Sequence, residues 1–206
     1  MKLLVKIFAI SVLSFAAHAS AMDDFRAFVA GTQAARADFT QTVFDVNGKK
    51  TQQASGTLAF VRPGKFRWQY VKPAQLIVSD GKRVSFFDED LNQVTVKKLD
   101  AAFASTPAAL LAGKSEIEAA YTLTTATATE ADGLSWIIAE PKLKDAGIEK
   151  VRLGFQKDGG QLSVMELFDP FGNRTQIVFN KFARNAKIDA KEFIFTPPKG
   201  ADVVGE

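Results

Sequence analysis

The chain has 206 residues with 26 basic and 23 acidic side chains, a formal net charge of +3, one histidine and no cysteine. Because the two signs of charge are nearly balanced and interspersed, the composition gives no electrostatic argument for nucleic-acid binding. Without cysteine, and with its only histidine, His18, in a segment that we expect to be removed, the chain has no disulfide, no Cys/His metal site and no His-dependent catalytic site.

The first 21 residues are predicted to form a secretory signal peptide. Two lysines precede an apolar run, and the small residues that follow fit an A-x-A cleavage pattern ending at Ala19 or at Ala21. The apolar run is too short to cross a membrane, which takes about 20 residues. We therefore expect an exported protein whose mature chain starts near Ser20 or Met22, with a single domain over residues 22–206.

The mature chain is predicted to open with a short amphipathic helix. Asp23 or Asp24 is suited to cap its N-terminus, and an apolar stripe follows at the i, i+3, i+4, i+7 spacing of one helical face. The stripe consists of Phe25, Phe28, Val29 and Thr32. Such a stripe has to be buried, so we expect this helix to pack against another part of the fold.

Residues 36–97 are predicted to form six strands. Apolar and polar residues alternate with a period of two, and turn signals separate the runs, of which Asp80-Gly81 is the strongest. Short turns between successive strands favour an antiparallel meander. One of these strands places Phe66, Trp68 and Tyr70 on the same face.

An Ala- and Leu-rich segment over residues 98–119 is predicted to contain one or two short helices, with Thr106 as an N-cap and Pro107 as the first helical residue. Five further strands are predicted between residues 120 and 184, with hairpin turns at 157–160 and 169–173. The tail beyond them is short and extended. The fold is therefore predicted to be mainly β, with about eleven strands and a few helices in one domain.

Two explanations fit the aromatic strand and the high count of 18 phenylalanines. In the first, the helices cover the sheet permanently and the aromatic side chains are ordinary core. In the second, the same side chains line a concave wall, and the helices form a lid over a cavity for an apolar ligand. Aromatic stripes most often pack a core, so the pattern alone favours the first explanation.

Two polar motifs have ordinary structural explanations. Ala112–Ser115 matches only the end of a phosphate-binding loop, because Ala108 stands where that motif requires glycine. The acidic residues Asp88, Glu89 and Asp90 fit a solvated hairpin turn better than a glycosidase or Ca²⁺ site.

Arg62 follows a predicted strand and precedes Pro63-Gly64. An arginine at a strand end is usually solvated. Its five donors would also let it reach across the mouth of a barrel and bond to carbonyl groups of a covering helix or loop. Such a latch would be reversible, because each hydrogen bond contributes only about 1 kcal/mol net.

Several motifs, in their order along the chain, resemble the periplasmic outer-membrane lipoprotein carrier family of Gram-negative bacteria, the LolA family. They are ADFTQ, RPGKFRWQY, LIVSDGK, FFDEDLNQVTV, TPAALLAG, DPFGNRTQIVF and FIFTPPKGADVV. Each motif is weak alone, but their combination covers essentially the whole mature chain. The resemblance implies an incomplete, unclosed antiparallel β-barrel with an α-helical lid over a hydrophobic cavity.

The resemblance also implies a function. A protein of this family is a non-enzymatic periplasmic chaperone that takes acylated lipoproteins from an inner-membrane ABC release complex and delivers them to an outer-membrane receptor. Such a carrier needs no cofactor and no metal, and a monomer is the expected state. Burial of acyl chains explains the need for it, because each CH₂ group is worth about 0.8 kcal/mol.

The resemblance assigns roles to particular residues. Arg62 is expected to hold the lid closed through hydrogen bonds to the loop at Leu111 and Ala112. The residues expected to contact acyl chains are Phe25, Val29, Phe60, Phe66, Trp68, Tyr70, Leu110 and Leu111. The chain departs from the family pattern at small side chains in the lid, which predicts a thinner lid; these residues are Thr32, Ala35, Ala108 and Ala109.

Three alternatives remain open at this point. A binding module of the same shape could take other lipids or hydrophobic ligands. The outer-membrane receptor that shares this architecture needs a lipidated N-terminal cysteine, which this chain lacks. An enzyme built on carboxylates alone would depend on Asp88, Glu89 and Asp90.

Overall fold

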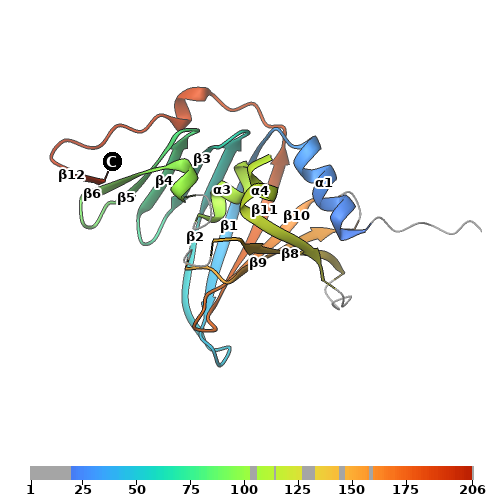
Figure 1. Ribbon diagram of the computed structural model, residues 1–206. Coiled ribbons are helices and arrows are strands. Elements are labelled where there is room, and N and C mark those ends of the chain that lie inside the picture. Colours follow the sequence, from blue (N-terminus) through green and yellow to red (C-terminus); the bar gives the residue numbers. More distant parts are fainter. Residues whose placement is uncertain are drawn as a thin grey trace, which may run out of the picture.

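A single curved sheet carries the fold, and the helices α1, α3 and α4 lie on its concave side (Figure 1). The computed structural model describes residues 20–102, 106–113, 115–126, 133–143, 147–157 and 160–205. The predicted signal segment lies outside these residues up to position 19, as does part of the predicted turn at 157–160. In the part of the chain described, no helix is long and apolar enough to span a membrane.

The sheet has 12 strands in the order β12-β6-β5-β4-β3-β2-β1-β11-β10-β9-β8-β7. The strands are β1 (Ala34–Phe44), β2 (Lys50–Val61), β3 (Lys65–Tyr70), β4 (Gln75–Asp80), β5 (Arg83–Asp88), β6 (Gln93–Lys98), β7 (Tyr121–Thr125), β8 (Leu134–Pro141), β9 (Lys150–Gln156), β10 (Leu162–Phe168), β11 (Arg174–Arg184) and β12 (Asp202–Gly205). Because β12 and β7 are edge strands, the sheet is an unclosed barrel, which confirms the predicted fold class.

The predicted meander is confirmed, since β1 to β6 pair antiparallel in sequence order. The turn between β4 and β5 is the predicted one. Gly81 has a φ of 95°, and the Asp80 carboxylate accepts the backbone N–H groups of Lys82 at 2.7 Å and Arg83 at 2.8 Å. An aspartate that bonds its own turn and a glycine in the left-handed region are what close this hairpin.

The twelfth strand was not predicted. β12 pairs in parallel with β6, and Asn92 anchors it by donating its side-chain amide to the Gly200 carbonyl at 2.9 Å. A parallel pair that joins segments so far apart in sequence has no turn between its strands, so local patterning gives no signal for it. The 3₁₀ helix η2 (Ala190–Phe193) lies in the tail before β12.

Helix α1 (Ala21–Gly31) begins one residue after its cap, which is Ser20 and not Asp23 or Asp24 as predicted. The Ser20 hydroxyl accepts the Asp23 N–H at 3.2 Å, and the Asp23 carboxylate accepts the Ser20 N–H at 3.2 Å. This reciprocal capping box lowers the pKa of Asp23 through the hydrogen bonds from Ser20. Thr32 is also not in the helix, since it is the C-cap residue.

The described residues of the middle segment form three short α-helices, which are α2 (Leu99–Ala102), α3 (Pro107–Ala112) and α4 (Ser115–Ala120). Pro107 is the first residue of α3, as predicted. Thr106 occupies the N-cap position, but its side chain makes no capping hydrogen bond. The sequence predicted one or two helices here. The additional helix was missed because helices of only four to six residues are too short to show a clear apolar period.

Gly56 is a position where the fold requires glycine. A Cβ atom there would lie 1.9 Å from the Gln69 carbonyl oxygen and 2.7 Å from Phe39 Cζ. We expect Gly56→Ala to lower the free energy of unfolding by about 3 kcal/mol, because the β2–β3 pairing would have to shift. Urea unfolding checks this, with Gly31→Ala as the matched control. Its nearest atom would be 3.4 Å away at the flexible end of Arg184, so a similar loss there would contradict the steric explanation.

Candidate functional site

The candidate site lies between α3 and the strands beneath it. Phe60, Phe66 and Trp68, which we call the wall, project from β2 and β3 toward this helix, and α3 packs on both strands. Leu110 and Leu111 of α3 are each 2% exposed, and wall and helix belong to one buried cluster. In this conformation Leu110 and Leu111 are buried against the wall, at the place where the family resemblance implied a hydrophobic cavity.

Arg62 joins the end of β2 to the end of α3. Its Nη1 donates to the Gly113 carbonyl, one residue beyond the predicted acceptors Leu111 and Ala112. The Ala112 carbonyl instead accepts the backbone N–H of Gly64 at 2.9 Å. The contact between Arg62 and the lid segment therefore exists, with a shifted acceptor, and its role as a latch stays a prediction.

The Arg62 side chain is unusually buried for a cation, at 6% exposed. Its guanidinium carbon lies 5.3 Å from the ring centres of both Phe28 and Phe60. Within the described part of the chain, Nε and Nη2 have no hydrogen-bond partner. Burial lowers the pKa of Arg62 to about 10, because removal from water disfavours the charged form. Arg62 thus gives the α3 end one side-chain hydrogen bond, and the two rings hold its guanidinium in place at a cost in desolvation.

Two further buried polar atoms near α3 have no partner in the described structure, namely Trp68 Nε1 and Thr106 Oγ1. An unsatisfied buried polar group costs about 1–3 kcal/mol. Thr106 directly precedes α3, and Trp68 belongs to the wall beneath it. The polar groups that the core leaves unsatisfied therefore surround this one helix, so its closed position is less favourable than burial of its apolar side chains alone would make it.

A continuous line of aromatic rings, which we call the aromatic track, crosses the concave face. Successive ring centres are 4.6–6.2 Å apart, within the range of favourable aromatic contacts. Its members in order are Tyr70, Phe39, Trp68, Phe179, Phe182, Phe28, Phe155 and Phe25. The track runs from β3 to α1, so it links the wall to the first helix.

Tyr70 ends the track at the rim of the sheet. It is half-buried, and its hydroxyl donates to Gln41 Oε1 at 3.0 Å. Burial raises the pKa of Tyr70 to about 12. Tyr70 therefore stays neutral at ordinary pH, and it presents an apolar ring with a polar tip.

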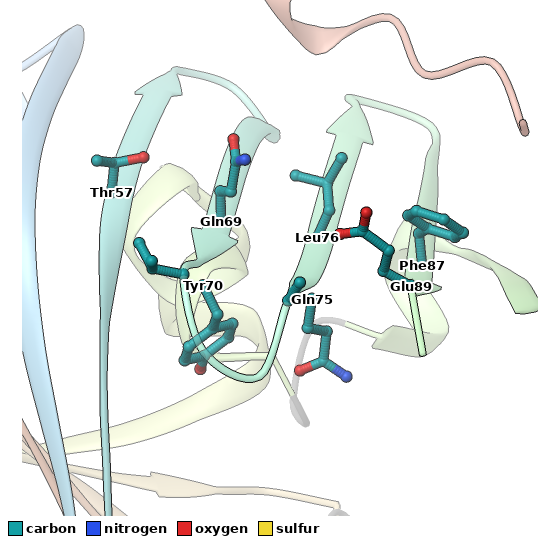
Figure 2. A pocket seen from close by; sticks show the side chains of 9 residues that line it. Thr57, Gln69, Tyr70, Gln75, Leu76, Phe87 and Glu89 are labelled. Carbon is teal, nitrogen blue, oxygen red and sulfur yellow. The ribbon is translucent and has the colours of Figure 1, made fainter. Parts of the chain in front are cut away.

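A pocket of about 510 Å³ beside Tyr70 is not the expected acyl site (Figure 2). Thr57, Gln69, Leu76 and Phe87 stand opposite one another on β2 to β5, on the face of the sheet away from the wall. Glu89 and amide groups share this lining, so the pocket is open and partly polar. An acyl chain needs a continuous apolar surface, which the aromatic track provides on the other face.

All eight residues predicted to contact acyl chains lie in or against one buried cluster. Phe25, Phe60, Phe66, Trp68, Leu110 and Leu111 are members of it, while Val29 and Tyr70 pack against it. Their role in binding stays a prediction. Sequence reasoning missed Phe39, Phe155, Phe179 and Phe182, and it placed Phe28 on the helical stripe without assigning it to the site.

The acidic group at Asp88 has the predicted structural role. The Asp88 carboxylate accepts the Leu91 N–H at 3.1 Å in the turn between β5 and β6, and Glu89 and Asp90 are exposed. Among the described residues, no three acidic or histidine side chains gather into a possible metal site. Asp88 therefore stabilises the turn between β5 and β6, as the sequence predicted.

A family model and several known proteins match this chain over almost its whole length. The family described as "Outer membrane lipoprotein carrier protein LolA" matches residues 30–196. Proteins named outer-membrane lipoprotein carrier protein from Dechloromonas aromatica, Chromobacterium violaceum and Methylobacillus flagellatus are 51%, 49% and 45% identical to this chain. The matches cover 95%, 93% and 95% of this chain and 93%, 91% and 94% of those proteins.

Solved structures with low sequence identity share the fold. A conserved uncharacterized protein from Thermus thermophilus has a TM-score of 0.54 at 14% identity, covering 89% of this chain and 96% of that one. A DUF1329 family protein from Desulfovibrio piger has a TM-score of 0.51 at 12% identity, with 84% and 94% covered. These likenesses concern the architecture of the sheet alone.

Proposed function

Since the chain belongs to the outer-membrane lipoprotein carrier family, we propose that it carries lipoproteins by burying their acyl chains between α3 and the wall. One observation supports this site above all others. Trp68, which belongs to both the wall and the aromatic track, lies on a strand covered by α3. Among the described residues, unsatisfied polar atoms lie around this helix, and Arg62 gives its end one side-chain hydrogen bond. A ligand that displaces this helix meets an apolar surface ready for it.

The energies favour such an exchange. A buried CH₂ group gains about 0.8 kcal/mol, so a dozen methylenes gain about 10 kcal/mol on leaving water. Against this stand the bond from Arg62 to the Gly113 carbonyl, worth about 1.5–3 kcal/mol, and the burial of Leu110 and Leu111, worth about 1.5–3 kcal/mol each. Acyl chains can therefore displace α3, and the return of α3 to the wall offsets part of the cost when the chains leave.

We propose that the carrier acts in the periplasm as a monomer and that it catalyses no reaction. It receives lipoproteins from an inner-membrane ABC release complex and passes them to an outer-membrane receptor. Cofactors and metals have no part in the process, because burial of the acyl chains is the whole chemistry. The family name supports lipoproteins as the cargo. The two membrane partners and the monomeric state are part of the proposal.

The deciding experiment measures release. Spheroplasts that make a radiolabelled outer-membrane lipoprotein are incubated with the purified mature protein. We expect the label to appear in the soluble fraction in a one-to-one complex with the carrier. If a control carrier releases the label and this folded protein does not, the proposal is wrong. Mass spectrometry of lipids extracted from the purified protein then tests the alternative, a module for other hydrophobic ligands.

The capping box of α1 leads to a prediction about the leader. Cleavage after Ala21 would remove Ser20, which supplies the cap, and Ala21, which is buried. Loss of an N-cap side chain costs about 1 kcal/mol. We therefore expect cleavage after Ala19, and intact-mass measurement of the exported protein should show Ser20 as its first residue. A mature chain that starts at Met22 would contradict this.

A further inference from the structure

Two turns, one between β1 and β2 and one between β10 and β11, are stabilised by the same pattern of hydrogen bonds. In one, between β1 and β2, the Asp45 carboxylate accepts the N–H groups of Asn47 and Lys49, both at 2.9 Å. In the other, between β10 and β11, the Asp169 carboxylate accepts the N–H groups of Phe171 and Asn173, both at 2.9 Å. Each turn is thus held by its own aspartate, and the two lie at the same end of the sheet (Figure 1).

These rigid turns expose apolar side chains. Phe171 is 82% exposed and Val46 is 67% exposed. The turns touch, because a Cβ atom at Gly172 would lie 3.0 Å from Val46 Cγ2. A large aromatic side chain held in water by a well-bonded turn has no role in the core, so it is available for contact outside the molecule. We call Val46 and Phe171 the apolar tip.

Behind the apolar tip, cations and aromatic rings alternate across five strands. Opposite one another in register stand Lys150, Phe168, Arg174, Phe44 and Lys50, on β9, β10, β11, β1 and β2. Their neighbours in the same strands, such as Met165 and Ile177, are buried in the core, so this row lies on the outer face.

The rings of the row are covered by its cations. Lys150 Nζ lies 4.7 Å from the Phe168 ring centre, and the Arg174 guanidinium lies 4.4 Å from the Phe44 ring centre. Lys49 and Lys50 add exposed ammonium groups beside the tip.

The acidic groups at this end keep their negative charge, and most of them are held in place by hydrogen bonds or ion pairs. Asp45 and Asp169 bond to their own turns, and Glu166 is shared by Arg152 and Arg174 at 3.0 and 2.7 Å. Glu149 is exposed. The lysines Lys49, Lys50 and Lys150 therefore have no carboxylate partner among the ion pairs of the described residues.

We propose that this end of the barrel makes transient contact with an anionic bilayer surface, with the apolar tip in the interface and Lys49, Lys50 and Lys150 facing lipid phosphates. Apolar and aromatic residues flanked by lysine and arginine are the composition that suits a membrane interface. Two inserted side chains and a few basic residues give only weak, reversible attachment, since stable anchoring needs more buried apolar area. A shuttle requires contact of that strength.

Flotation with vesicles tests the surface. The mature protein is mixed with vesicles of phosphatidylethanolamine with 30% phosphatidylglycerol, or of phosphatidylcholine alone, at low and at physiological salt. We expect binding to the anionic vesicles that falls with salt, and at least about fivefold less binding by the double variant Val46→Ser/Phe171→Ser. The double variant should keep the wild-type unfolding midpoint, because both side chains are already exposed.

Leu91→Ser is the matched control, since Leu91 is 69% exposed in a turn outside this surface. It should bind vesicles like the wild type. Equal binding to both vesicle types, or no loss in the double variant, would overturn the proposal. So would an effect of Val46→Ser/Phe171→Ser on self-association instead, measured by sedimentation. These readouts need no lipoprotein, so they are independent of the release experiment.

Discussion

Arg62→Leu is expected to leave the protein folded and to impair delivery of its cargo. In the empty protein, closing α3 forms the charge-assisted bond from Arg62 to Gly113, worth about 1.5–3 kcal/mol. In the loaded protein, a leucine would face alkyl chains more favourably than a guanidinium does. Both changes favour the loaded state, so we expect at least about tenfold less transfer.

Transfer is measured from a purified carrier–lipoprotein complex to vesicles that hold the receptor, with the labelled lipoprotein as the readout. Arg67→Leu serves as the control, because Arg67 lies on β3 but its side chain points away from the wall, toward Gln69. Its transfer should match the wild type. Normal transfer by Arg62→Leu would show that Arg62 is not a latch.

The second large effect is expected at Phe28. This residue is 1% exposed, and its ring centre lies 5.5 Å from that of Phe155 and 6.0 Å from that of Phe182. We expect Phe28→Ala to lower the free energy of unfolding by about 3–5 kcal/mol, because the truncated side chain leaves a cavity where α1 meets the sheet. Opening of this contact should also raise the binding of an apolar fluorescent dye by the empty protein.

Val29→Ala is the control for Phe28→Ala, since Val29 is the next residue of α1 and only partly buried. Its loss should be near 1 kcal/mol in urea unfolding, with dye binding unchanged. Amide exchange in α1 adds a local readout, because an undocked helix exchanges faster than the strands. Similar losses in the two variants would mean that Phe28 has no special part in holding α1.

Local patterning predicted the strands well because each buries one face, so the period of two survives in the sequence. Asp80-Gly81 fixed its hairpin for the same local reason. The cap at Ser20 was missed because a small residue next to Ala19 also fits a cleavage site. β12 was missed because its partner β6 lies far away in the sequence, with Asp202 opposite Gln93, and no turn joins the two strands.

The aromatic track could not be predicted from local sequence patterns. Phe39 and Phe179 are opposite one another only because β1 pairs with β11, a closure between the two ends of the domain. Phe155 and Phe28 meet only because α1 folds back over β9. These contacts depend on register across distant segments, which a single sequence does not reveal. Arg62 was identified because its position before Pro63-Gly64 is local, whereas its acceptor Gly113 is not.

The position of β1 in the sheet has a mechanical consequence. On one side of it lie β2 to β6, and on the other side lie β11 to β7, each a set of neighbouring hairpins. The two edges, β12 and β7, are not joined, so the sheet resembles an open book with β1 as its spine. We expect the sheet to widen by a change of angle along β1, because this leaves every hairpin intact.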